Sequence, residues 1–227
     1  MIESPPKRPS LQEAAEWVIR ALRDEGLPVM MGGRAALDYL GEHTGSVDVD
    51  ILVGTDFRGA LSVLDAYAER GDLDLAGAVP GAVVRYLVSG YRIVDVMDLH
   101  SVHPRLFELL QRDACRRIAF GSAEHVDVVS REGYFVLAIM IGLRGFARAK
   151  EDPMMKVREA WILFGERTDK AEVDRLLVEL DAGTSFDRAL KPPAPRQRGR
   201  SLRGPSGRRG SARRSTRRPA AARSRRS

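Results

Sequence analysis

The chain has 227 residues, 44% of them hydrophobic, a length that suits one good-sized domain or a domain with a small helical addition. The formal net charge of +6 is uneven, because residues 191–227 hold 14 Lys and Arg and no acid, whereas the first 190 residues hold 23 Lys and Arg and all 31 acids. The single cysteine, Cys115, excludes an intrachain disulfide and favours a reducing compartment. The longest apolar run, at 134–143, is too short to span a bilayer, and the N-terminus has no apolar leader, so we expect a cytoplasmic protein without a membrane partner.

Apolar periodicity and turn residues predict that helices and strands alternate as far as about residue 129. Ser10 and Glu13 form a capping-box pattern at the start of the first helix. Ser89-Gly90 is a two-residue hairpin signal between two strands. Helices are expected at 11–25, 34–40, 57–70 and 104–114, and strands at 27–31, 47–53, 83–88, 91–97 and 125–129.

Beyond residue 130 the pattern changes to helices alone, which we expect at 131–148, 153–165 and 170–181. From about Lys191 the chain is rich in Arg, Gly, Ser, Pro and Ala and cannot bury a core. The fold class is therefore predicted as α/β (α+β), an α/β part followed by a helical part. Three regions are expected: an α/β domain at 1–129, a C-terminal helical segment at 130–190 and a disordered Arg-rich tail at 191–227.

Asp48 and Asp50 interrupt an otherwise apolar strand, 47–53. Side chains at i and i+2 share one face of a strand, so both carboxylates project side by side. Like charges at that spacing repel unless a positive charge lies between them. Carboxylate oxygens suit Mg²⁺ or Mn²⁺, which favours a metal site, although a solvent-facing edge strand explains many isolated Asp-x-Asp patterns.

Two further features support the metal site. Gly32 and Gly33 precede a predicted helix, where glycine lets the backbone approach a ligand and free N–H groups favour phosphate. Asp95 lies in a later predicted strand, flanked by valines as Asp50 is flanked by Val49 and Ile51. Carboxylates that converge from two strands can hold two metal ions, as phosphoryl transfer requires.

These residues resemble the signature of the nucleotidyltransferase superfamily with the DNA polymerase beta-like fold: an apolar residue and two glycines, then Asp-apolar-Asp-apolar, then a later Asp. The resemblance covers about residues 28–165. It is closest to the small prokaryotic group of abortive-infection nucleotidyltransferases, the toxins of type IV toxin–antitoxin systems. Such relatives often carry Arg four residues before the first Asp, where this chain has Thr44.

The resemblance implies a nucleotidyltransferase-type mixed sheet and an enzyme that uses Mg²⁺ or Mn²⁺. It implies that Asp48, Asp50 and Asp95 are both catalytic and metal-binding. For the nucleotide it implies contacts from Gly32 and Gly33. Ser46 could contact phosphate or simply begin the strand, and Lys150 is the preferred lysine for nucleotide contact.

The leading hypothesis is transfer of a nucleoside monophosphate from an NTP to a hydroxyl on protein or RNA, in a toxin–antitoxin or defence system with an antitoxin-like protein partner. Two alternatives stay open. The chain could be a catalytically weak relative that acts by binding as a regulatory partner, or it could bind RNA through the Arg-rich tail at 191–227. The acceptor, the NTP base and the oligomeric state are not fixed by the sequence.

Overall fold

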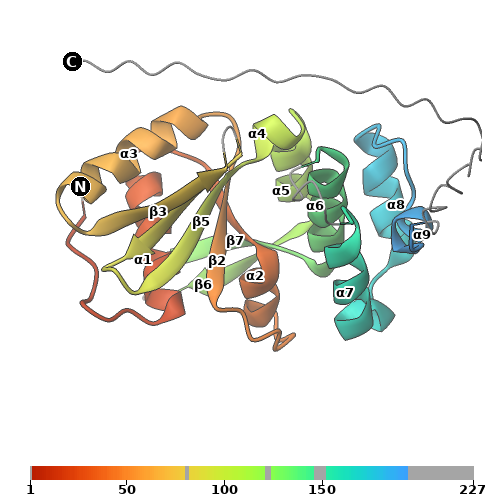
Figure 1. Cartoon of the computed structure of the whole chain (residues 1–227), viewed down its shortest axis with the longest axis horizontal. Coiled ribbons are helices and arrows are strands. Elements are labelled where there is room, and N and C mark those ends of the chain that lie inside the picture. The colour runs from red at the N-terminus through yellow and green to blue at the C-terminus, as the bar shows by residue number, and fades with distance from the viewer. Residues whose placement is uncertain (1, 80–81, 121–123, 146–151, 194–227) are drawn as a thin grey trace, which may run out of the picture. The chain divides into compact units, whose positions relative to one another are not determined.

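A mixed seven-stranded sheet organises the computed structural model, which describes residues 2–79, 82–120, 124–145 and 152–193 (Figure 1). The strands are β1 (Val29–Gly32), β2 (Asp48–Val53), β3 (Leu73–Val79), β4 (Val83–Val88), β5 (Arg92–Asp98), β6 (Cys115–Phe120) and β7 (Glu124–Val129). Their order is β3-β4-β5-β2-β1-β7-β6. The pairs β2–β5 and β1–β7 are parallel and the other neighbours are antiparallel, so the predicted mixed sheet is confirmed.

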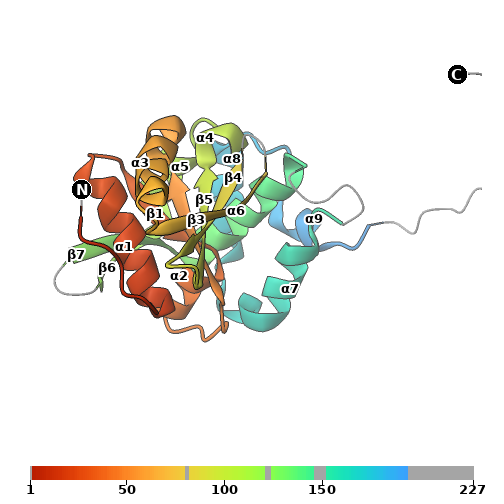
Figure 2. The same cartoon turned by 60° about the vertical axis from the view of Figure 1, so that its left-hand side comes forward.

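Helices cover both faces of this sheet, as Figure 1 shows. The helices are α1 (Leu11–Asp24), α2 (Gly33–Tyr39), α3 (Phe57–Glu69), α4 (Leu99–Val102), α5 (Leu106–Asp113), α6 (Arg131–Leu143), α7 (Met155–Phe164), α8 (Lys170–Glu179) and α9 (Phe186–Leu190), with a 3-10 turn, η1 (Gly165–Arg167). Helix α7 lies beside α6 and α9 in Figure 2. None of the helices in the described ranges is long and apolar enough to cross a bilayer.

The alternation of side chains along β2 divides the core into two clusters. Val49 and Ile51 pack with α1 and α3 on one face of the sheet. Leu52 packs on the opposite face with α4, α5 and α6, and α7, α8 and α9 extend that cluster. Because Asp48 and Asp50 share the parity of Leu52, they lie on the face that the helical segment covers.

Side-chain caps begin helices α1 and α8, and the one at α1 was predicted. Ser10 Oγ accepts a hydrogen bond from Glu13 N (3.1 Å), and Glu13 Oε2 accepts one from Ser10 N (2.7 Å), so the capping box of α1 is confirmed. Asp169 caps α8 by accepting from the backbone N–H groups of Ala171 and Glu172. The side-chain acceptors satisfy N–H groups that have no partner within the helix.

Four helices and strands were missing from the sequence prediction: β3, α4, β6 and α9. Six of the seven β3 residues are exposed, so this edge strand has no apolar alternation, and backbone pairing with β4 defines it. The predicted helix at 131–148 ends at Leu143, and residues 146–151 lie outside the described ranges. The predicted strand 91–97 is shifted by one residue, to Arg92–Asp98.

The residues up to Pro193 form one compact unit. The predicted boundary between 129 and 130 stays a prediction, and residues 194–227 of the predicted tail lie outside the described ranges. A buried carboxylate connects the two sides of the predicted boundary. Glu42, which follows α2 and whose side chain is 3% exposed, forms ion pairs with Arg131 of α6 and Arg167 of η1.

We expect Glu42→Gln to lower the free energy of unfolding by about 3 kcal/mol, because it leaves two guanidinium groups without their buried counter-charge. Glu179→Gln is the control, since Glu179 pairs with three arginines, Arg105, Arg112 and Arg175, but its side chain is 28% exposed. The control should cost less than about 1 kcal/mol. Urea denaturation of the variants measures both values, and equal costs would contradict a structural role for the buried pair.

Candidate carboxylate site

The structure brings together the three carboxylates that the sequence singled out. Strands β2 and β5 pair in parallel with Asp50 directly opposite Asp95, and Asp48 lies two residues earlier on the same face. The charges of Asp48 and Asp95 both act on the Asp50 carboxyl. The expectation that 47–53 and the later strand are neighbours with their aspartates converging is thus met in the geometry.

Asp50 is the most strongly perturbed member of this cluster. Burial of its carboxylate raises its pKa to about 7, and the negative charges of Asp48 and Asp95 contribute in the same direction. The positive charges of Lys156 and Arg85 lower it in part. The described residues provide no hydrogen bond or ion pair to the Asp50 side chain. It is therefore a carboxylate that needs a positive ligand or a proton.

Gly32 and Gly33 allow the start of α2 to lie close to β2. Gly33 has φ +64°, and a Cβ added there would lie 1.7 Å from Asp50 Oδ2. A Cβ on Gly32 would lie 2.7 Å from Leu52 Cδ1. The two glycines thus let the start of α2 contact β2 closely, which is a packing reason for their presence. Their predicted contact with phosphate stays a prediction.

Ser46 and Lys150, the other two predicted site residues, have different outcomes. Ser46 Oγ donates to the backbone oxygen of Asp48 (2.9 Å) and lies 3.2 Å from Asp48 Oδ1. Ser46 N donates to Asp38 Oδ2 (2.9 Å). These contacts agree with a serine that begins the strand and orients Asp48. Lys150 lies outside the described residues.

Arg85 of β4 is a site residue that the sequence analysis missed. Antiparallel pairing of β4 with β5 places Arg85 opposite Asp95. Its Nε donates to Asp95 Oδ1 (2.7 Å) and one terminal nitrogen donates to Asp95 Oδ2 (2.6 Å), while the same nitrogen lies 3.9 Å from Asp48 Oδ2. The hydrogen bonds to Asp95 raise the pKa of Arg85, so the guanidinium is permanently charged.

Two further basic residues lie in this region: Lys156, whose charge acts on Asp50, and Arg34, whose charge acts on Tyr134. Lys156 of α7 is close enough for its charge to lower the pKa of Asp50. Tyr134 of α6 has a pKa that burial raises and on which the charges of Arg34 and Asp50 both act, so the tyrosine lies near both. In the part of the chain that is described, neither Arg34 nor Lys156 forms an ion pair. No short motif marks Lys156, which comes near Asp50 from α7.

The donor set fits a divalent cation in part. Within the described ranges no group of three or more Asp, Glu, His and Cys side chains is arranged to hold a metal ion. Asp48 and Asp50 supply hard oxygen ligands on one face, and a cation between them would relieve their repulsion. Both oxygens of Asp95 already accept hydrogen bonds from Arg85, so a cation bound there would share these oxygens with the positive charge of the arginine.

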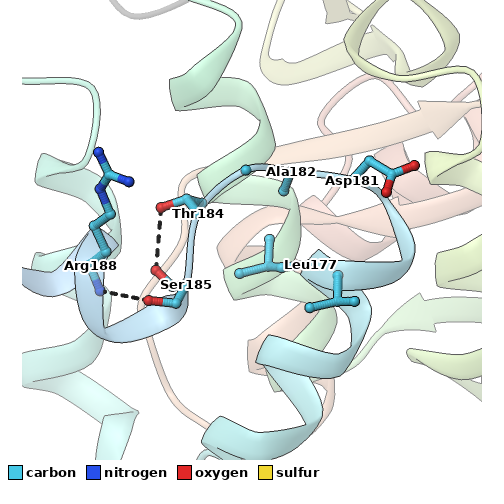
Figure 3. Close-up of a pocket in the computed structure, with 8 residues that line it drawn as sticks. Leu177, Asp181, Ala182, Thr184, Ser185 and Arg188 are labelled. Atoms are coloured by element: carbon cyan, nitrogen blue, oxygen red, sulfur yellow. Dashed lines mark hydrogen bonds between the residues drawn. The ribbon is translucent and has the colours of Figure 1, made fainter.

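A surface hollow of about 440 Å³ lies elsewhere, where α8 leads into α9 (Figure 3). Its lining includes Leu177, Asp181, Thr184 and Arg188 and none of the predicted site residues. Arg188 N donates to Ser185 Oγ (3.3 Å) to cap α9, as the figure shows. The hollow is thus formed by the turn between two helices, apart from the carboxylate cluster.

No protein-family model matches the chain, and no curated protein matches it. Several solved structures are similar to the chain. The antibiotic-resistance factor ANT(2'')-Ia in solution has 16% identity and a TM-score of 0.47 over 74% of this chain and 90% of its own. The same factor with adenylyl-2''-tobramycin has 16% identity and a TM-score of 0.48 over 75% and 96%.

An antigenic nucleotidyltransferase-like protein from Paracoccidioides brasiliensis has 15% identity and a TM-score of 0.46, over 80% of this chain and 94% of its own. The structures that this chain is similar to are thus nucleotidyltransferases or nucleotidyltransferase-like proteins. The predicted closeness to toxin–antitoxin enzymes stays a prediction.

Gly33→Ala should lower the free energy of unfolding by about 3 kcal/mol, because the new methyl group would displace the Asp50 carboxylate in addition to straining the backbone. Gly41→Ala is the matched control: Gly41 has φ +86°, but a Cβ there meets nothing within 4 Å. The control should cost about 1 kcal/mol, the backbone strain alone. Chemical denaturation measures both, and equal values would argue against the close contact between Gly33 and Asp50.

The raised pKa of Asp50 predicts a pH-dependent stability in metal-free buffer. The folded chain keeps a proton on Asp50 that the unfolded chain, with a pKa near 3.9, gives up, so the stabilising contribution falls as pH rises from about 4 to about 7. Asp50→Asn removes this loss. We expect the free energy of unfolding of the variant to exceed that of the wild type by about 2 kcal/mol at pH 8 and by little at pH 4.5. The full shift in pKa would correspond to about 4 kcal/mol.

Urea denaturation in EDTA at the two pH values makes this measurement. Asp74→Asn, an exposed carboxylate on the edge strand β3, is the control and should change stability little at either pH. An Asp50→Asn variant less stable than the wild type at pH 8 would show that the carboxylate has a positive partner in the folded chain.

Proposed function

We propose that this chain is a metal-dependent nucleotidyltransferase that moves a nucleoside monophosphate from an NTP to a hydroxyl on protein or RNA. The observation that carries the proposal is the alignment of Asp50 with Asp95 across the parallel pair β2–β5, with Asp48 on the same face. The pKa of about 7 at Asp50 supports a site built to hold positive charge. The resemblance of the Gly-Gly and Asp-x-Asp motifs to the superfamily supports the reaction class.

The reaction forms a bond between the acceptor hydroxyl oxygen and the α-phosphorus of the NTP. The bond from that phosphorus to the bridging oxygen breaks, pyrophosphate leaves, and the hydroxyl proton passes to Asp95. Asp48 and Asp50 would hold Mg²⁺ or Mn²⁺, which supplies charge neutralisation for the triphosphate and the acceptor oxygen. Ser46 orients Asp48 through its hydrogen bonds.

Arg34 and Lys156 are the basic residues that we assign to the triphosphate. Lys156 lies near the carboxylate cluster, since its charge acts on Asp50, and Arg34 lies near Tyr134, on which the charge of Asp50 also acts. Neither has an ion pair among the described residues. A triphosphate carries several negative charges, and unpaired cations on both sides of it favour its binding. Gly32, Gly33 and Lys150 remain proposed phosphate contacts from the resemblance.

A macromolecular acceptor is proposed in preference to a small one because the helical segment that faces the carboxylates is short. The resemblance to toxin-type enzymes supports a role in a toxin–antitoxin or defence pair, with an antitoxin-like protein as partner. These finer assignments, like the choice between protein and RNA, are proposals about this chain.

One observation favours the binding-only alternative. Both oxygens of Asp95 accept hydrogen bonds from Arg85, so the proposed proton acceptor is occupied in this structure. A chain in which that ion pair never opens would bind a nucleotide at Asp48 and Asp50 without transferring it. It would then act as a regulatory partner.

Incubation of the purified full chain with each α-labelled NTP, Mn²⁺ or Mg²⁺ and a cell extract tests the proposal. Label should appear on protein or RNA with the wild type, fall at least about a hundredfold with Asp50→Ala, and persist with the control Asp74→Ala. A wild type that binds NTP but transfers none of the four nucleotides would favour the binding-only function.

A further inference from the structure

Arg85 occupies the position where a cation is needed. Its guanidinium contacts Asp95 through two hydrogen bonds and lies 3.9 Å from Asp48 Oδ2, and its charge also acts on Asp50. The Asp95 side chain is only 10% exposed, whereas the Arg85 side chain is 44% exposed. The arginine therefore covers the cluster from the solvent side and has room to move without disturbing the core.

A second ion pair in the same sheet shows what is particular about Arg85. Arg117 lies opposite Asp127 on the antiparallel pair β6–β7, in the same relation as Arg85 to Asp95. Arg117 makes one hydrogen bond to Asp127, at 3.2 Å, and Asp127 is additionally bonded by Gln111. On the next strand, β1, the residue paired with Asp127 is Met30, so this pair has no carboxylate opposite it on β1.

We infer that Arg85 is an exchangeable counter-ion, which holds Asp95 in the free chain and releases it when a divalent cation enters beside Asp48 and Asp50. This inference rests on the proposed function. The physical reason is that the two positive charges compete for the same carboxylate oxygens, since both oxygens of Asp95 are engaged by the arginine. The released guanidinium stays at the exposed side of the cluster, where it can pair with a phosphate of the NTP.

Arg85 is then a positioning residue that opposes binding of the cation in the absence of nucleotide. Entry of the cation must break two charge-assisted hydrogen bonds and place two positive charges close together. Removal of the arginine should therefore strengthen binding of the cation, even though it weakens the folded chain. A merely structural role predicts the reverse for the cation, because a loosened site binds it less well.

The experiment is titration of the full chain with Mn²⁺ alone, without nucleotide, followed by electron paramagnetic resonance of the free ion. Arg85→Gln should bind Mn²⁺ roughly tenfold more tightly than the wild type, a coupling of ordinary size for two ligands that compete. The matched control Arg117→Gln should bind it with wild-type affinity. Equal or weaker binding by Arg85→Gln, with a wild type that binds Mn²⁺, would overturn the inference and leave the proposed metal site standing.

Absence of Mn²⁺ binding by the wild type and by Arg85→Gln alike would overturn the metal site and this inference together. Thermal unfolding gives a second measurement. Arg85→Gln should unfold at a lower temperature than the wild type in EDTA and should gain more from Mn²⁺ than the wild type gains. A smaller rise in unfolding temperature with Mn²⁺ than that of the wild type would overturn the inference.

Arg85→Lys keeps the charge and loses the two-pronged contact, so it carries the test if the Gln variant does not fold. It should bind Mn²⁺ roughly threefold more tightly than the wild type, a smaller gain than that of Arg85→Gln. Affinity at or below the wild-type value in a folded Arg85→Lys variant would contradict the exchange.

Discussion

The repulsion among three neighbouring carboxylates is the constraint on which the rest of the site depends. Asp48, Asp50 and Asp95 share one face of the sheet, and parallel pairing fixes their spacing. Positive charge from two different elements, Arg85 of β4 and Lys156 of α7, acts on this cluster and partly offsets the repulsion. The close approach of Gly33 then fixes one side of the Asp50 carboxylate, so the cluster is held by packing on one side and by charge on the other.

Strand parity explains why the carboxylate cluster could be predicted and why its arginine could not. Alternation alone places Asp48 and Asp50 on one face, and valines on both sides of Asp95 place it on the matching face of a second strand. A two-residue loop at Ser89-Gly90 would pair Arg85 with Val94. In the structure Val88 pairs with Arg92, so Tyr91 belongs to the loop and the register moves by one residue.

The rest of the site depends on contacts between distant segments. Lys156 comes near Asp50 because α7 packs against α6. The apolar pattern of 153–165 predicts a helix there, but it does not predict which element that helix packs against. Strand β3 was missed for a related reason, since its exposed side chains carry no alternation and its backbone bonds alone define it. Local periodicity thus gives the elements that bury side chains, while edge strands and tertiary neighbours need the assembled fold.

The hairpin of β4 and β5 also bears on the order in which the chain can assemble. Arg85 and Asp95 are 10 residues apart and meet within one local hairpin, whereas β2 must pair with β5 across the intervening α3, β3 and β4. Hairpins close in about 1–10 μs, and pairings between distant segments are slower. We therefore expect Asp95 to acquire its arginine before Asp48 and Asp50 arrive. The later β2–β5 pairing then joins two carboxylates to an already neutral pair, which lowers the repulsion among bare like charges during folding.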